Sequence, residues 1–181
     1  MSGMISNCKR CRLSEGRNRI VHGQGPSGSR VAIIGEAPGA QEDVAGKPFV
    51  GRAGKLLDKS LEMHGVRRDR VFVSNIVRCR PPGNRKPKRD EIAACRPFLI
   101  KELSSIEPRI VMTLGGVAFT ALTGYSRPLR EVAGKRFDVE LNGIHLTVVP
   151  NYHPAAAMRS RAIRRYFEKI IAENLSGIKG R

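Results

Sequence analysis

Short runs of aliphatic and β-branched residues alternate with longer segments whose apolar residues recur at helical spacing. The strand-like runs are 31–34, 70–77 and 109–115, and the helical segments between them are 53–64 and 89–106. Strands that alternate with helices in this way predict parallel strands joined by helical crossovers. We therefore expect an α/β fold in a single domain, with a mainly parallel central sheet flanked by helices on both faces.

The second half of the chain continues the pattern and adds a hairpin. A short helix is expected through 117–124, and 135–150 has the pattern of two strands around Asn142-Gly143, a dipeptide typical of a type I′ turn. One last helix is expected from about Pro154 to Leu175. Its apolar stripe consists of Ile163, Phe167, Ile170 and Ile171.

Three polar segments each follow a predicted strand. They are 35–43, 75–85 and 151–159. Ligands of open α/β sheets bind beyond the carboxyl ends of the strands. The sequence therefore predicts that side chains from these three segments converge on one crevice.

The net charge of the chain is strongly positive. Its 181 residues include 33 Lys plus Arg against 16 Asp plus Glu, a formal charge of +17. Although a generally solvated basic surface is the plainer alternative, this imbalance favours nucleic acid as the partner. No apolar run approaches the roughly 20 residues of a membrane span, and the first residues lack the apolar core of a signal peptide. We expect an intracellular, nucleoid-associated monomer.

Common motifs of other enzyme classes fail on their context. "GQGPSG" (23–28) precedes a strand where a dinucleotide-binding motif needs a helix, and "GRAGKLL" (51–57) lacks the spacing and the hydroxyl residue of a P-loop. The order of histidines and cysteines does not match a zinc deaminase.

The four cysteines of the chain are Cys8, Cys11, Cys79 and Cys95. Disulfides are rare in intracellular proteins, and four thiols that include one C-x2-C pair suit either zinc or an iron–sulfur cluster. Zinc ribbons usually present two close pairs. The wide separation of Cys79 and Cys95 therefore favours a cluster, while zinc stays the alternative.

Four separated motifs follow the C-x2-C pair: "GEAPGAQED", "GKPFVGRAG", "SNIVRCRPPGNRKP" and "YHPAAAMR". In this order they resemble the iron–sulfur uracil-DNA glycosylases, the fourth family of that superfamily, from Cys8 to about Arg159. The resemblance implies a compact uracil-DNA glycosylase-like fold and excision of uracil from DNA in base excision repair. It also implies a structural [4Fe–4S] cluster on the four cysteines, which would tie down an N-terminal arm, 1–29, of a single domain 1–181.

Three side chains suit a pocket for an extruded base. Phe49 offers a ring face for stacking, or is an ordinary loop anchor. Asn75 carries a donor and an acceptor for uracil O4 and N3–H, or caps a turn. His153 is aimed by the following proline and would donate to uracil O2 as negative charge grows there, or is a surface histidine.

The carboxylates after the first strand need an explanation in so basic a chain. We expect Glu36 to activate the attacking water or to stabilise the cationic sugar, beside the Ala37 N–H, a second donor to uracil O2. Glu42 and Asp43 would instead cap the following loop or pair with Lys47 or Arg52.

The sequence thus predicts a monofunctional glycosylase that acts on deoxyuridine in DNA. Two alternatives stay open: a glycosylase for hypoxanthine or xanthine, and a non-catalytic iron–sulfur module that binds nucleic acid. The candidate contacts to DNA phosphates are Arg80, Arg85, Lys86, Arg159 and Arg161.

Overall fold

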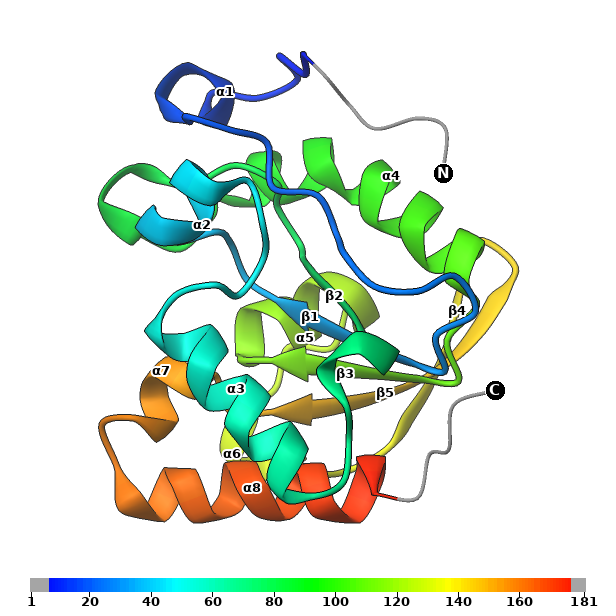
Figure 1. Cartoon of the computed structure of the whole chain (residues 1–181). Coiled ribbons are helices and arrows are strands. Elements are labelled where there is room, and N and C mark those ends of the chain that lie inside the picture. The colour runs from blue at the N-terminus through cyan, green and yellow to red at the C-terminus, as the bar shows by residue number, and fades with distance from the viewer. Residues whose placement is uncertain (1–6, 177–181) are drawn as a thin grey trace.

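A five-stranded sheet forms the centre of the protein in a computed structural model that describes residues 7–176 (Figure 1). The order of the strands is β2-β1-β3-β5-β4. The first four positions pair in parallel, and β4 closes one edge antiparallel to β5, which confirms the predicted mainly parallel sheet. The strands are β1 (Val31–Gly35), β2 (Phe72–Asn75), β3 (Ile110–Leu114), β4 (Phe137–Leu141) and β5 (Ile144–Asn151).

Helices cover both faces of this sheet (Figure 1). The longer ones are α3 (Arg52–Met63), α4 (Arg89–Ile106), α5 (Gly116–Thr123) and α8 (Arg161–Leu175), and the short ones are α1 (Leu13–Gly16), α2 (Ala40–Ala45), α6 (Leu129–Val132) and α7 (Pro154–Ala157). Two 3₁₀ turns, Arg68–Arg70 and Pro82–Asn84, flank β2.

Alternate residues of β1 belong to two separate apolar clusters. Ile33 packs in a cluster with Leu57 of α3 and Phe167 of α8, whereas Ile34 packs with residues of α4 and α5 such as Phe119. Successive side chains of a strand point to opposite faces, so a strand covered on both sides must be apolar throughout. Every residue of β1 is accordingly buried.

The structure corrects the prediction of one last helix from Pro154 to Leu175. The chain forms α7, leaves helical geometry, and begins α8 after Ser160, whose hydroxyl accepts a hydrogen bond from the Ile163 N–H at 3.3 Å. A serine that satisfies a free N–H in this way is a strong start signal for a helix. The break places α7 at the carboxyl edge of the sheet.

The predicted N-terminal arm is fastened to the sheet and helices along its described part, residues 7–29. Asn18 donates from its backbone and its amide to the buried carboxylate of Asp43, at 3.0 and 2.6 Å. The Gly23 N–H donates to Glu102 of α4, and Gln24 bridges Val73 of β2. Residues 1–6 of the arm lie outside the described residues.

Candidate active site

A cavity of about 420 Å³ opens at the carboxyl ends of β1, β2 and β5. The three segments expected to converge there do so, and the loop that contains Phe49 joins them. We call this the active-site cavity. The predicted site residues that line it are Glu36, Ala37, Phe49, Asn75, Arg85, His153 and Arg159.

Asn75 and Phe49, which line the active-site cavity, pack closely against the α-carbon of Gly35 at the end of β1. A β-carbon at Gly35 would lie 2.5 Å from both Asn75 Oδ1 and Phe49 Cζ. Asn75 is 2% exposed, and within residues 7–176 its side-chain amide forms no hydrogen bond, whereas its backbone carbonyl accepts one from Arg78. This buried amide can therefore bind a ligand that carries an acceptor and a donor side by side.

The ring of Phe49 is held by an unusual backbone and by a neighbouring carboxylate. Phe49 has a φ of 56°, in the left-handed region, and is 8% exposed. Glu42 accepts hydrogen bonds from the Gly39 N–H at 3.1 Å and the Gly51 N–H at 2.7 Å, which joins the loops on both sides of the cavity. The Phe49 ring lies 6.4 Å from the ring of His153, centroid to centroid.

His153 is oriented as a neutral hydrogen-bond donor. Its Nδ1 accepts the Ala155 N–H at 3.2 Å, so the proton of a neutral ring must sit on Nε2. Burial lowers the pKa of His153, and the charge of Glu42 opposes this less strongly. At neutral pH the ring is therefore uncharged and presents an Nε2–H.

The three carboxylates that follow β1 have different surroundings. Asp43 holds Asn18, and Glu42 caps α2 and holds Gly51, so neither pairs with Lys47 or Arg52 in the described chain. Glu36 lines the cavity and has no side-chain hydrogen bond to any described residue. Burial raises its pKa, which the charge of Lys86 opposes. Glu36 is thus a carboxylate available to a reacting group.

Not all of the predicted phosphate contacts face the active-site cavity. Arg159 lines it, whereas Lys86 lines a neighbouring groove, Arg161 begins α8, and Arg80 donates to Asn84 Oδ1 at 2.8 Å. Their contacts to phosphate stay predictions. No helix in residues 7–176 is long and apolar enough to cross a membrane.

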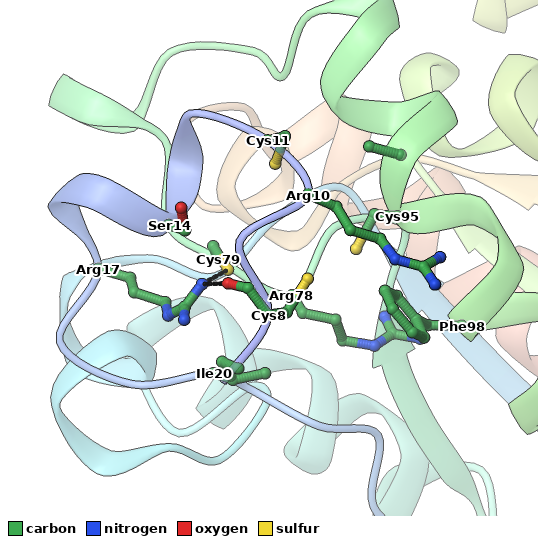
Figure 2. Close-up of a pocket in the computed structure, with 11 residues that line it drawn as sticks. Cys8, Arg10, Cys11, Ser14, Arg17, Ile20, Arg78, Cys79, Cys95 and Phe98 are labelled. Carbon is green, nitrogen blue, oxygen red and sulfur yellow. Dashed lines mark hydrogen bonds between the residues drawn. The ribbon is translucent and has the colours of Figure 1, made fainter. Parts of the chain in front are cut away.

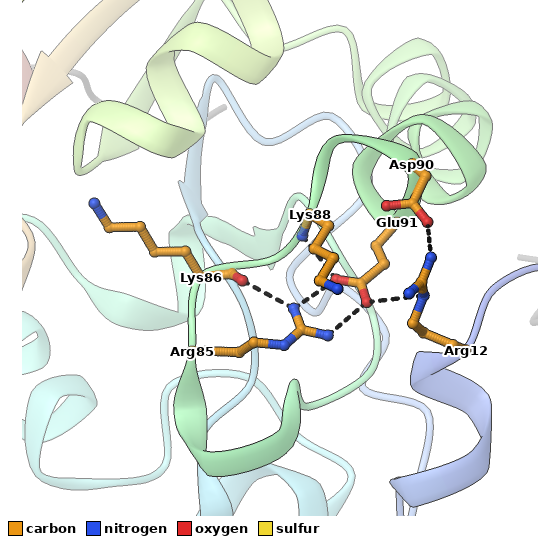
Figure 3. A network of polar contacts seen from close by, with 6 residues as sticks. All are labelled: Arg12, Arg85, Lys86, Lys88, Asp90 and Glu91. Atoms are coloured by element: carbon orange, nitrogen blue, oxygen red, sulfur yellow. Dashed lines mark hydrogen bonds and ion pairs between the residues drawn. The ribbon is translucent and has the colours of Figure 1, made fainter.

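Arg85 lines the cavity but is also the partner of a buried carboxylate (Figure 3). Its guanidinium donates twice to Glu91, at 2.6 and 2.8 Å, and the Lys88 N–H donates to the same carboxylate at 2.7 Å. Arg12 of the N-terminal arm lies 3.8 Å from Glu91 as well. These contacts, led by the Arg85 hydrogen bonds, lower the pKa of Glu91 to about 2.

The four cysteines line a second cavity, which we call the cysteine cavity (Figure 2). Cys79 and Cys95 are buried, Cys8 and Cys11 are half-buried, and none forms a disulfide. Arg17 donates to Cys79 Sγ at 3.4 Å and to the Cys8 carbonyl at 2.8 Å. Burial raises the pKa of Cys95 to about 11, so binding a metal there would release its proton.

The four thiols of the cysteine cavity are soft donors that suit either zinc or an iron–sulfur cluster. No three His, Cys, Asp or Glu side chains among residues 7–176 are placed to hold a single metal ion. Sulfur ligands at 2.3 Å around zinc would lie about 3.8 Å apart. An iron–sulfur core is larger than one ion, so its thiolates stand further from one another. Four thiols around one cavity fit that arrangement.

Arg78 is a functional candidate that sequence analysis missed. It is 2% exposed, lines the cysteine cavity and donates to the backbone carbonyl of Asn75 in the active-site cavity. Its guanidinium also forms an ion pair with Glu102 at 2.6 Å. Nothing local distinguishes this arginine from the other basic residues around it. Its position makes it a structural link between the two cavities.

The family model that this chain matches and three of its relatives all belong to one group of proteins. Residues 22–174 match the family model described as the uracil DNA glycosylase superfamily. A type-4 uracil-DNA glycosylase of Pyrobaculum aerophilum is 42% identical over 96% of this chain and 91% of its own length. Similar proteins of the same description occur in Saccharolobus solfataricus (42% identical, 91% of this chain and 79% of the relative) and Thermotoga maritima (36% identical, 99% and 91%).

The lowered pKa of Glu91 predicts how stability depends on pH. A carboxylate with a depressed folded-state pKa stabilises the protein above its ordinary pKa of 4.5, and this contribution is lost as the pH falls toward about 2. Glu91→Gln should lower the free energy of unfolding at pH 7 by on the order of 1–3 kcal/mol. Urea unfolding at a series of pH values should show the gap to the parent closing in acid. A gap that is the same at pH 7 and at about pH 2 would contradict this, and Glu62→Gln on the exposed face of α3 is the control.

Proposed function

The chain belongs to the uracil-DNA glycosylase superfamily and, within it, to the type-4 uracil-DNA glycosylases, and from this premise we propose how its active-site cavity excises uracil. The protein is a hydrolase of N-glycosyl bonds that acts in base excision repair. One observation carries the assignment of its site. The unpaired Asn75 amide, the Phe49 ring and the neutral His153 line the same cavity.

Base recognition rests on Asn75 and Phe49. A glycosylase must extrude its target nucleotide and read the exposed edge of the base. The Asn75 amide would donate to uracil O4 and accept from N3–H, while the ring of Phe49 stacks on the base. Cytosine presents a donor at C4 where uracil presents an acceptor, so the same amide orientation rejects it.

The leaving group is stabilised by two donors. As the C1′–N1 bond breaks, its electron pair moves onto the uracil ring and negative charge grows on O2. The Nε2–H of His153 and the backbone N–H of Ala37 would donate to that oxygen. A neutral imidazole donates a hydrogen bond without surrendering its proton, so uracil leaves as an anion.

Glu36 completes the reaction on the sugar side. We assign it to orient a water molecule whose oxygen bonds to C1′, with one water proton passing to the carboxylate. A pKa raised by burial makes Glu36 a better proton acceptor, and its charge also stabilises the cationic sugar. Phosphate contacts from the basic residues named above, Arg80, Arg85, Lys86, Arg159 and Arg161, would hold the DNA in register.

We further propose that the four cysteines hold a structural [4Fe–4S] cluster. Such a cluster would cross-link the arm through Cys8 and Cys11, the loop after β2 through Cys79, and α4 through Cys95. The hydrolysis requires no redox step, so the role assigned to the cluster is to hold these segments together. We also propose that the chain acts as a single domain and as a monomer on the DNA of the cell.

Base choice tests the role of Asn75. The parent should release uracil from a U·G duplex and leave hypoxanthine in an I·C duplex intact. Asn75→Asp loses the donor to uracil O4 and should slow uracil release by on the order of 10²-fold or more, with trace release of cytosine. Alkaline cleavage of labelled oligonucleotides measures both. Asn142→Asp makes the same change in the distant β4–β5 turn and should leave activity intact; unchanged uracil release in Asn75→Asp would remove Asn75 from the site.

Single-turnover kinetics tests Glu36. Glu36→Gln keeps the shape of the side chain but cannot accept a proton, so the rate should fall by roughly 10²–10⁴-fold while binding of uracil-containing DNA holds. The parent rate should also fall in acid through a pKa above 4.5, because burial raises the pKa of Glu36. The variant should lack that acid limb. Glu62→Gln is the control. A rate of Glu36→Gln within a few-fold of the parent rate would mean that Glu36 has a structural role and does not take part in the reaction.

Colour and stability test the cluster. Anaerobically purified protein should be brown, with broad absorption near about 400 nm and several irons per chain. Cys8→Ser should lower the melting temperature, because the arm loses its cross-link, more than it lowers the rate of the folded fraction. A colourless parent that contains one stoichiometric zinc would overturn the assignment.

A further inference from the structure

A third cavity, of about 550 Å³, lies between α6, the end of β5 and α8. Two aromatic side chains line it, Tyr152 after β5 and Tyr166 of α8, with ring centroids 6.4 Å apart and planes at 44°. We call it the tyrosine pocket. Tyr166 is 58% exposed, so one large aromatic surface is presented to solvent. The tyrosine pocket shares no lining residue with the active-site cavity.

Positive charge surrounds the two rings. Arg130, Lys135 and Lys169 line the tyrosine pocket, and its one acidic lining residue, Glu173, lies 3.6 Å from Lys169. Lys135 has no ion pair among residues 7–176. Exposed aromatic faces beside cations are the combination that binds single-stranded nucleic acid, since bases stack on rings and phosphates pair with the cations.

A row of cations connects this pocket to the active-site cavity. Arg161, Arg165 and Lys169 are all exposed and recur every four residues, which places them along one side of α8. The row begins two residues after Arg159, which lines the active-site cavity. It is about 12 Å long, the rise of several stacked nucleotides at about 3.4 Å each. In Figure 1, α8 runs from α7 along the lower side of the molecule.

We propose that the tyrosine pocket binds an unpaired nucleotide of the strand that carries the uracil, a few nucleotides from the extruded base. The base stacks on Tyr166, and the backbone follows the cation row of α8. A duplex hides its base faces in the stack and cannot make this contact, so the pocket favours single-stranded DNA. The identity of the strand rests on the proposed function, but binding by the pocket can be tested without uracil.

Intrinsic fluorescence gives a direct readout of stacking. The chain has no Trp and three Tyr, two of which line the tyrosine pocket. In a Tyr125→Phe background every emitting side chain belongs to the pocket. Titration with uracil-free oligothymidylate should quench this emission, whereas a blunt duplex should quench it little. If polyglutamate quenches and oligothymidylate does not, the pocket binds acidic peptides and the proposal fails.

Substitution of Tyr166 measures how much base stacking contributes to the affinity for single-stranded DNA. Tyr166→Ala should weaken binding of oligothymidylate by about 5- to 150-fold, the range of one base–aromatic stack, and leave duplex binding within about 2-fold. Tyr166→Phe keeps the ring and should bind like the parent. Lys135→Ala should weaken binding of single strands. Arg109 precedes β3 at the amino ends of the parallel strands, so Arg109→Ala should not weaken it. Equal losses for single strand and duplex in Tyr166→Ala, or no loss for either, would overturn the proposal.

A nested set of substrates tests whether the two sites hold one strand. Uracil-containing single strands, shortened stepwise from either end, should lose affinity for the parent in one step when they no longer reach Tyr166. Tyr166→Ala should lack that step. Both proteins should still release uracil from the shortest strands. If they do, the presence or absence of the affinity step reports on the tyrosine pocket and not on the proposed function. Absence of a step in the parent would mean that the pocket does not bind the substrate strand.

Discussion

An ion pair between the buried Arg78 and the half-buried Glu102 joins the parts of the molecule on which the candidate site depends. Arg78 donates to the carbonyl of Asn75 and borders the cysteine cavity, and Glu102 accepts from Ser74 of β2 and from the arm at Gly23. Removal of Glu102 would leave the charge of Arg78 buried without its partner, which costs up to about 3–5 kcal/mol. The backbone position of Asn75, whose amide we propose reads uracil, is therefore coupled to the arm and to the cysteine cavity.

In this chain of charge +17, the carboxylates around the active-site cavity differ in whether a hydrogen bond holds them. Asp43, Glu42 and Glu91 are fixed by hydrogen bonds and hold together the segments that surround the site. Glu36 alone of the three after β1 faces the active-site cavity without a partner among the described residues. A positive surface attracts phosphates but destabilises a cationic sugar, so the proposed role of Glu36 would place one unpaired carboxylate where it offsets that positive field.

Sequence patterns predicted the sheet and the meeting of the strand ends, but they missed one helix boundary and one ion pair. Aliphatic runs and parallel topology predicted that Glu36, Asn75 and His153 would meet, because strand ends share one edge. The break between α7 and α8 was missed, since apolar periodicity continues across a point that the Ser160 cap decides. Partners distant in sequence were also missed: Arg78 and Glu102 are 24 residues apart, and no local pattern pairs them.

The end of β5 serves two cavities at once. Tyr152 lines the tyrosine pocket and the adjacent His153 lines the active-site cavity, so one short backbone segment fixes the distance between them. Proteins that extrude a base from a duplex commonly insert an apolar wedge into the stack. Ala156 of α7, by contrast, is small, and Met158 is the exposed large apolar side chain beside it. A strand that is already unpaired needs no large wedge, because extruding its base requires the least energy. The aromatic surface then lies where it holds a neighbouring nucleotide instead of opening a helix.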